Sequence, residues 1–301
     1  MNKKPLIKPA ELIILGFLNT RMTLSKDDRK NYLSLKKGYE GEVLFNSLTD
    51  KLECECLTVN GVLLEFNNTK FQIDSLIILQ QTIYMNEVKN FEGDYYYEKQ
   101  LLYSANGSER KDPLLQLKRS SSLLRQLLQN LGLYMPIEAR VVYVNPEFTL
   151  YQASRNEPII FPTQVNRYLK NINTTPSKLN GKHEKLANKF ISLDIIEPPY
   201  PRLPPYGYDK LRKGITCELC SSFSIFVGVN NCVCGDCGHV ESVESAVVRT
   251  VREIKLLFPD WKITTSEVFE WCKVIECRKR ISRILGKNFK IIGVRNWAYY
   301  E

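Results

Sequence analysis

The chain has 301 residues, of which 44% are hydrophobic and 25% are charged, and its formal net charge is +9. This composition is that of an ordinary folded protein and argues against wholesale disorder, while the length favours two domains over one. The positive charge favours a polyanionic partner, either nucleic acid or an anionic membrane surface. Most of it lies in residues 245–301, which hold twelve Lys or Arg and six Asp or Glu.

The N-terminal residues superficially resemble a signal peptide, because Lys3, Lys4 and Lys8 precede an apolar stretch. Glu11 opens that stretch, however, and no small-residue cleavage site follows it, so the sequence predicts a short amphipathic helix instead. No stretch approaches the roughly 20 apolar residues that a membrane span needs. We therefore expect a cytoplasmic protein without a membrane partner. In such a reducing compartment, its nine cysteines indicate metal sites or buried thiols rather than disulfides.

The first long helix that the hydrophobic pattern predicts covers residues 36–52. Its expected apolar face consists of Tyr39, Val43, Leu44 and Leu48. Residues 71–79 and 82–88 are then predicted as two strands, joined as a hairpin by a turn at Gln80–Gln81.

A second helix and a further strand follow the hairpin. Apolar periodicity predicts the helix at residues 114–131, and an apolar run predicts a buried strand at residues 139–145. The order helix, antiparallel strands, helix, strand predicts an α/β core with a mixed sheet flanked by helices.

Acidic side chains stand where the two predicted strands of the hairpin come together. Asp74 lies near the start of the first strand and Glu87 near the end of the second, so a hairpin brings both carboxylates to one end of the sheet. Glu87 and Lys89 are two residues apart and therefore share a face of their strand. Phosphodiester hydrolysis needs a hard cation held by oxygen ligands and a cationic or basic group beside the attacking water, and these residue types supply both. Charges at strand ends are often only solvated, but these adjoin buried strands, which favours a functional site.

Four separated segments resemble, in order and spacing, the nuclease-related domain (NERD) family. They are Gly38-Tyr39-Glu40-Gly41-Glu42, Phe71-Gln72-Ile73-Asp74-Ser75-Leu76-Ile77-Ile78, Asn86-Glu87-Val88-Lys89-Asn90 and Asp112-Pro113-Leu114-Leu115-Gln116. The resemblance covers roughly residues 35–155 and implies the PD-(D/E)XK restriction-endonuclease-like fold.

The resemblance also implies a role for each acidic position. Asp74 and Glu87 would hold Mg²⁺ or Mn²⁺, with the carbonyl of Val88 as a third ligand. Lys89 would orient or activate the attacking water and stabilise the negative charge of the transition state.

The first predicted helix offers two acids, Glu40 and Glu42, which point roughly 160° apart at about 100° per residue, so only one can face the site. The resemblance matches Glu42 to the family's helix glutamate, which binds metal or positions water. It matches Gln116 to a glutamine on the later helix, which would support the site by hydrogen bonding. The alternative for either side chain is an exposed position on its helix.

Residues 195–205 contain five of the fourteen prolines, which neither a helix nor a central strand accommodates. This segment marks a seam in the chain. We expect a helical N-terminal extension, a nuclease-like domain, a connecting segment with the proline-rich linker, a zinc ribbon and a basic tail. Their predicted bounds are residues 1–34, 35–155, 156–212, 213–244 and 245–301.

Two Cys-X2-Cys pairs follow the linker, thirteen residues apart. They are Cys217 with Cys220 and Cys234 with Cys237. Each pair places two thiolates in a tight turn, and four thiolates in a tetrahedron satisfy Zn²⁺, so the sequence predicts a zinc ribbon. Cys232 would break the pairing geometry, and His239 lies just beyond the second turn. A closed four-sulfur site leaves no position for water, so this zinc would be structural.

The basic tail is predicted to form a helix-turn-helix-like pair. Thr264 and Glu267 make a capping box for a helix that ends at about Cys272, and a short turn leads into a second helix at residues 276–285. Its outward basic residues, predicted to contact DNA, are Arg278, Lys279, Arg280 and Arg283, with Ile281, Ile284 and Leu285 facing inward. Residues 289–300 are predicted as a trailing pair of strands. The alternative is a basic helix that is only solvated.

Together these features predict a Mg-dependent nuclease that hydrolyses phosphodiester bonds, favouring DNA, with a zinc-stabilised C-terminal region that contacts the DNA. The alternative is a nucleic-acid-binding or regulatory protein that uses the nuclease fold as a scaffold without catalysis. The sequence leaves open whether the substrate is double-stranded DNA, single-stranded DNA or RNA. Two-strand cutting by this fold often uses a dimer, so the resemblance also raises a homodimer.

Overall fold

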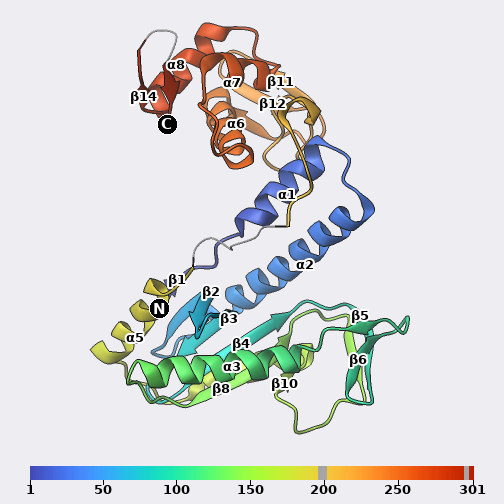
Figure 1. Ribbon diagram of the computed structural model, residues 1–301, viewed down its shortest axis with the longest axis vertical. Coiled ribbons are helices and arrows are strands. Elements are labelled where there is room, and N and C mark those ends of the chain that lie inside the picture. Colours follow the sequence, from blue (N-terminus) through green and yellow to red (C-terminus); the bar gives the residue numbers. More distant parts are fainter. Residues whose placement is uncertain (196–201, 295–297) are drawn as a thin grey trace. The chain divides into compact units, whose positions relative to one another are not determined.

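The computed structural model describes residues 1–195, 202–294 and 298–301 (Figure 1). The chain forms two compact units. The first comprises Met1–Lys8 and Leu33–Pro201, and the second comprises Pro9–Tyr32 and Arg202–Glu301. Of the proline-rich segment predicted as a seam, residues 196–201 lie outside the described residues.

A six-stranded sheet forms the centre of the first unit, in the order β1-β2-β3-β4-β8-β10. Its strands are β1 (Asn2–Lys4), β2 (Leu57–Phe66), β3 (Thr69–Ile78), β4 (Ile83–Lys89), β8 (Ile137–Tyr143) and β10 (Ile159–Ile160). β2, β3 and β4 are antiparallel neighbours, whereas β1, β8 and β10 pair in parallel. The predicted mixed sheet is therefore confirmed, as are the hairpin of β3 and β4 and the buried strand β8.

Helices cover both faces of this sheet. They are α2 (Lys26–Thr49), α3 (Pro113–Asn130), α4 (Val165–Thr174) and α5 (Gly181–Ser192), with a short 3-10 turn, η1 (Pro162–Gln164), before α4. One core cluster joins α3 and α5 to the sheet, and another joins α2 and α4 to it. Each sheet face is thus closed by its own apolar layer, as the predicted α/β class requires.

Helix α2 differs from its prediction in two respects. It begins at Lys26, ten residues before the predicted start, and its first residues to Tyr32 belong to the second unit. The predicted apolar face is only partly confirmed, because Leu48 packs against the core whereas Val43 and Leu44 are each 43% exposed. The buried positions of the helix are instead Gly41, Phe45 and Thr49.

A second, smaller sheet of four strands belongs to the first unit, in the order β7-β6-β5-β9. Its strands are β5 (Gly93–Glu98), β6 (Leu101–Ser104), β7 (Glu109–Arg110) and β9 (Phe148–Tyr151). No sequence pattern predicted this sheet. Its strands β5, β6 and β7 lie between β4 and α3 in the chain, whereas β9 follows β8, and the sheet contributes walls to both hollows described below.

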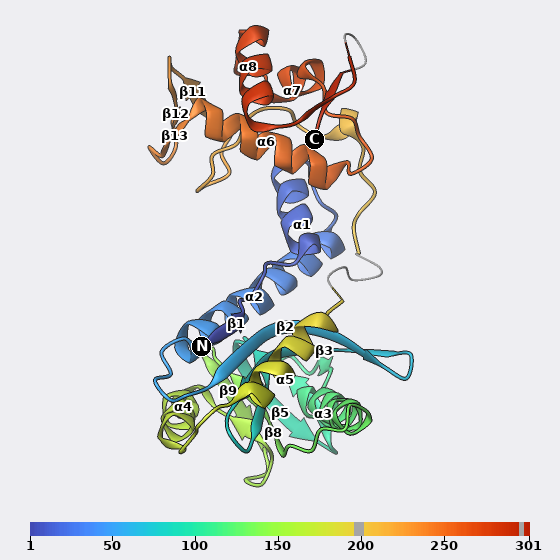
Figure 2. The same cartoon turned by 90° about the vertical axis from the view of Figure 1, so that its left-hand side faces the viewer.

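The second unit combines a three-stranded ribbon with a helical core. The ribbon consists of β11 (Ile225–Val227), β12 (Asn231–Cys234) and β13 (Val240–Ser242). The remaining elements are α1 (Ala10–Arg21), η2 (Tyr208–Lys210), α6 (Val243–Leu257), α7 (Thr265–Cys272), α8 (Arg278–Asn288) and the antiparallel pair β14 (Ile291–Ile292) and β15 (Tyr299–Tyr300). Figure 2 shows the ribbon at the N-terminal end of α6, to which β13 connects directly. The predicted helices α7 and α8 and the trailing strand pair are confirmed, whereas α6 was not predicted.

Helix α1 packs within the second unit although it lies far from the rest of that unit in sequence. Leu18 is fully buried in the core cluster that contains Trp271 and the inner face of α6. Arg21 is buried and pairs with the buried carboxylate of Glu253, where its Nη2 lies 2.9 Å from Oε2. A buried charge without a partner is costly, so this pair ties α1 to α6. Across the described residues, no helix combines the length and apolarity of a bilayer span.

Candidate functional site

The β3–β4 hairpin brings two carboxylates together at one end of the large sheet. The last paired residues of this ladder are Ser75 and Asn86, so Asp74 and Glu87 follow as the next pair outward. The backbone N–H of Val88 donates to Asp74 Oδ2 at 2.8 Å. Asp74 is 8% exposed and Glu87 only 1%, so both acids lie at the buried rim of the sheet, where the sequence analysis placed them.

Helix α2 adds a third carboxylate because Gly41 lets it approach the end of β4. A Cβ atom at Gly41 would lie 2.6 Å from the Cβ of Asn90, which is too close for any larger residue. The side chain of Asn90 in turn donates to the Lys37 carbonyl at 2.8 Å. Glu42 follows Gly41 and lines the same pocket as Asp74 and Glu87. Glu40 is instead exposed and lies 3.9 Å from Lys36, which agrees with the choice of Glu42 as the inward acid.

Lys89 and Gln116 complete the group. The ammonium Nζ of Lys89 lies 2.6 Å from Glu87 Oε1 and donates to Gln116 Oε1 at 3.4 Å. Gln116 is placed by the start of α3, where Asp112 is the N-cap and accepts from the backbone N–H of Leu114 at 2.8 Å. A capped helix start fixes the first turn, which holds Gln116 toward the ends of β3 and β4.

The three carboxylates, Lys89 and Gln116 line one hollow of about 460 Å³. The sequence-predicted residues that it brings together are Glu42, Asp74, Glu87, Val88, Lys89 and Gln116. Sequence reasoning missed two cations there, Lys37 and Arg110. Lys37 pairs with Glu92, whereas the Nε of Arg110 donates to Ser104 Oγ at 3.1 Å, and no carboxylate pairs with Arg110 within the described parts of the chain. Arg110 lies on β7, and no sequence signal placed that strand.

The buried carboxylates repel one another. Burial raises the pKa of Asp74 well above its ordinary value, and the negative charges of Glu87 and Glu42 raise it further. Burial likewise raises the pKa of Glu42, to about 7, with Glu87 adding to the rise and Lys89 opposing it. For Lys89, burial alone would lower the pKa, but Glu87, Asp74 and Glu42 together leave it above its ordinary value. The Lys89 ammonium therefore does not offset the mutual repulsion of the three carboxylates, which favours a bound cation.

The donor set also fits a divalent ion. Glu87 Oε2 is buried and has no hydrogen-bond partner among residues 1–195, 202–294 and 298–301. A buried carboxylate oxygen without a partner is costly, so a cation there would remove an energetic penalty. Carboxylate and carbonyl oxygens are the ligands that Mg²⁺ prefers. Among the described residues, the three carboxylates do not place one oxygen each within 4.8 Å of one another, unlike the sulfurs of the cysteine cluster below.

The four predicted cysteines lie together in the second unit. The Sγ atoms of Cys217, Cys220, Cys234 and Cys237 all lie within 4.8 Å of one another. The Cys217–Cys237 and Cys220–Cys234 sulfur pairs are 3.5 and 3.6 Å apart. Zn–S bonds of about 2.3 Å in a tetrahedron separate the sulfurs by about 3.8 Å, so the cluster is compatible with Zn²⁺ and fits a zinc ribbon.

Two equivalent turns position these sulfurs. Each turn is closed by a backbone hydrogen bond of 3.0 Å, from Ser221 to Cys217 and from Gly238 to Cys234. Gly235 in the second turn cannot be replaced without a shift, because a Cβ atom there would lie 2.5 Å from Ser224 Oγ. Cys232 points away from the cluster into the apolar core of the second unit, as expected for a residue outside the ligand set.

The basic residues of α8 divide into two kinds. Arg280 donates to the carbonyl of Gly228 at 3.2 Å and to that of Val229, so it holds the ribbon turn, and Arg278 donates to Ser266 Oγ. Lys279 and Arg283 are exposed, and neither forms an ion pair within the described chain. The inner face of Ile281, Ile284 and Leu285 is buried as predicted.

The pocket lies in a stretch that is similar to a known family. Residues 37–144 match the family model of the nuclease-related domain. This stretch of the chain is similar to the nuclease-related domain. No curated protein and no solved structure matches the chain.

The nuclease-related domain includes each predicted residue of the carboxylate pocket, from Glu42 on α2 to Gln116 on α3. It also includes β5, β6 and β7 of the smaller sheet. The cysteine cluster and α8 lie outside the matched residues, so the match gives them no assignment.

Proposed function

We propose that the chain is a Mg-dependent nuclease that hydrolyses phosphodiester bonds of DNA, with Mn²⁺ as an alternative ion. The observation that carries this proposal is the pocket itself, where Asp74, Glu87 and Lys89 meet inside a nuclease-related domain and Glu87 keeps a buried oxygen free. Asp74, Glu87 and the Val88 carbonyl would hold the ion. When bound, the ion supplies positive charge that offsets the charge developing on the phosphate.

The side chains around the ion would divide the remaining work. Lys89 has three N–H donors, of which Glu87 and Gln116 accept two, so one is left to donate to the attacking water or the phosphate. Gln116 thereby fixes the direction of the lysine. Glu42 faces the same hollow and would position the water or support the ion.

The second unit would supply the DNA contacts. A zinc ion on Cys217, Cys220, Cys234 and Cys237 would hold the ribbon, which is too small to own a core. Among the predicted DNA-contacting residues, Lys279 and Arg283 are free to reach phosphates, while Arg278 and Arg280 hold α8 in place through Ser266 and the ribbon carbonyls.

Glu87→Gln tests the proposed function, with Glu92→Gln as a matched control. Both substitutions remove one carboxylate from the same hollow, but Glu92 is exposed and pairs with Lys37. Cleavage is measured with Mg²⁺ on linear, nicked, single-stranded and plasmid DNA. We expect Glu87→Gln to lower the rate by about 100-fold or more while DNA binding persists, and Glu92→Gln to stay close to wild type.

The opposite results are equally clear. Absence of cleavage by the wild type on every DNA substrate, with binding intact, supports the non-catalytic scaffold. Equal loss of activity in both variants shows that charge in the hollow, rather than Glu87 itself, sets the rate.

A further inference from the structure

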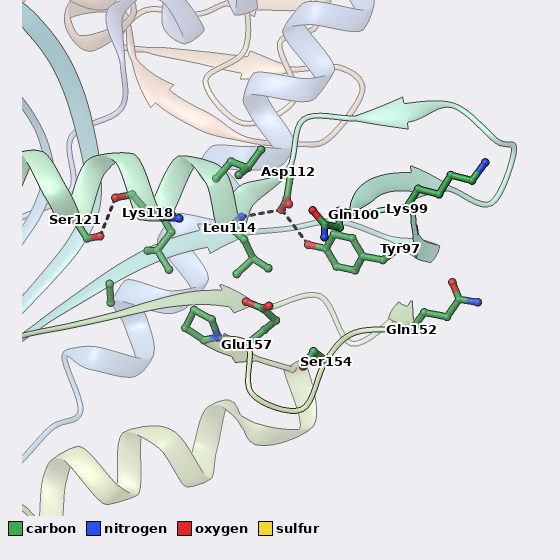
Figure 3. Close-up of a pocket in the computed structure, with 14 residues that line it drawn as sticks. Tyr97, Lys99, Gln100, Asp112, Leu114, Lys118, Ser121, Gln152, Ser154 and Glu157 are labelled. Atoms are coloured by element: carbon green, nitrogen blue, oxygen red, sulfur yellow. Dashed lines mark hydrogen bonds between the residues drawn. The ribbon is translucent and has the colours of Figure 1, made fainter.

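A second hollow of about 870 Å³ lies in the first unit (Figure 3). Its walls come from β5, the start of α3 and the loop that follows β9. Tyr97, Leu114, Leu117 and Pro158 give it a largely apolar surface. This volume is in the range of sites that enclose a small organic group.

The two hollows share a wall. Tyr95 and Tyr97 are two residues apart on β5 and therefore lie on the same face of the strand. Tyr95 lines the carboxylate pocket, whereas Tyr97 lines the second hollow. The start of α3 is shared in the same way, through Gln116 on one side and Leu114 on the other. The step from Tyr95 to Tyr97 is roughly 7 Å, so a nucleotide with its phosphate in the first hollow can reach the second with its base.

The charged groups that line the second hollow are two carboxylates, Asp112 and Glu157, and two lysines, Lys99 and Lys118. Asp112 Oδ1 is already engaged, because it accepts from Leu114 N–H and from the Tyr97 hydroxyl at 2.9 Å. Glu157 forms no ion pair or side-chain hydrogen bond within the described residues, and Figure 3 shows its carboxylate directed toward Leu114. Burial raises the pKa of Tyr97, and the hydrogen bond and charge of Asp112 and the charge of Glu157 raise it further, as expected for two carboxylates close to the hydroxyl. The apolar wall and the Glu157 carboxylate, which lacks a side-chain partner within the described residues, favour a flat group with N–H donors.

We propose that the second hollow binds an unpaired nucleic-acid base next to the phosphate that is cut. This inference rests on the proposed nuclease function. The ring of Tyr97 and the leucines would pack on the faces of the base, and Glu157 would accept from its N–H edge. Guanine presents two adjacent donors to one carboxylate, whereas thymine presents a single N–H between two carbonyls, so guanine is preferred over thymine.

The same geometry selects the form of the substrate. In a duplex, the N–H edge of each base is occupied by its pairing partner, so a base must be unpaired to present that edge to Glu157. The substrate is therefore a single strand, or a duplex with a displaced nucleotide.

Binding of short single strands tests the proposal. The full chain is titrated with fluorescently labelled dT12 and with the same strand carrying one central dG, in Ca²⁺ to limit cleavage. The wild type is expected to bind the guanine strand about five-fold more tightly or better. Glu157→Gln should abolish this preference, because the amide replaces one of the two acceptor oxygens that face the adjacent N–H donors with an NH2 donor. Glu98→Gln is the matched control, since Glu98 is an exposed acid of β5 that does not line the hollow, and it should keep the preference.

A second pair of variants examines the aromatic wall. Tyr97→Leu should weaken both strands by about five-fold or more through lost stacking, while Tyr97→Phe keeps the ring and the affinity. A wild type that binds the two strands equally, or a Glu157→Gln variant that keeps the preference for guanine, overturns the proposal. Failure of the nuclease proposal has a different signature, because the guanine preference would then persist without cleavage in Mg²⁺.

Discussion

The carboxylate pocket draws Glu42, Asp74, Glu87 and Gln116 from four separate elements, α2, β3, β4 and α3. The four cysteines instead come from two short turns on either side of one small hairpin of the ribbon. The pocket rests on a large sheet with an apolar layer on each face, whereas the ribbon has three strands of three or four residues. Loss of an ion should therefore leave the fold of the first unit intact but remove the support of the ribbon.

The largest expected effect is the loss of bound zinc from the ribbon. The purified wild type should contain about one zinc per chain, and Cys217→Ser combined with Cys234→Ser should remove it, because a tetrahedral site does not survive the loss of two thiolates. Zinc content and limited proteolysis of the ribbon measure the effect. Cys277→Ser is the control, since Cys277 is exposed and lies outside the cluster. Full zinc retention in the double variant would show that other ligands bind the ion.

Substitution of Gly41 tests whether α2 must lie in close contact with the end of β4. Gly41→Ala forces a Cβ atom against Asn90 and should displace Glu42, with a loss of stability of about 2 kcal/mol and a fall in cleavage rate of about 10-fold. Gly38→Ala is a matched control on the same helix, because no atom lies within 4 Å of the added Cβ. It should stabilise the protein by up to about 1 kcal/mol and leave the cleavage rate unchanged. Equal effects of the two substitutions would contradict a close contact at Gly41.

The pH dependence of the free energy of unfolding tests the repulsion between the carboxylates of the pocket. The pKa of Glu42 is raised from its ordinary value of 4.5 to about 7, first by burial. Its contribution to stability is therefore intact at low pH and is lost as the pH rises from about 4.5 through 7. In Mg-free buffer, Glu42→Gln should raise the free energy of unfolding at pH 8 by about 1 kcal/mol and change it little at pH 4. Glu40→Gln should change it at neither pH, and a matching gain there would argue against repulsion inside the pocket.

The smallest expected effect concerns α8. Lys279→Gln and Arg283→Gln should each lower the slope of log affinity for DNA against log salt by about 1, since each removes one phosphate contact. Arg280→Gln should leave the slope unchanged and instead loosen the ribbon turn, because its guanidinium donates to Gly228 and Val229. Fluorescence anisotropy at several salt concentrations measures all three variants. If only Arg280→Gln lowered the salt slope, Arg280 rather than Lys279 or Arg283 would be the phosphate contact.

Local sequence patterns predicted the elements that carry strong signals of their own. The long apolar periodicity of α3, the alternating apolar runs of β3 and β4, the capping box at Thr264 and the two cysteine turns all appear where they were expected. These signals depend on neighbouring residues, so one sequence is enough to detect them.

The features that were missed depend on distant contacts. The buried face of α2 includes Gly41, which has no side chain and therefore gives no hydrophobic signal in the sequence. The apolar residues Val43 and Leu44 are exposed instead. The smaller sheet has strands of two to six residues, too short for a clear alternation. The place of α1 in the second unit rests on the buried pair of Arg21 and Glu253, which lie more than 200 residues apart.

Calorimetric titration of Mn²⁺ into the zinc-loaded full chain tests the carboxylate pocket most directly, because it needs neither substrate nor turnover. We predict one ion per chain outside the zinc cluster in the wild type and in Glu40→Gln. In Asp74→Asn, affinity for that ion should fall by about 10- to 100-fold, since a carboxylate ligand becomes a neutral amide. Unchanged Mn²⁺ affinity in Asp74→Asn would contradict an ion held between β3 and β4.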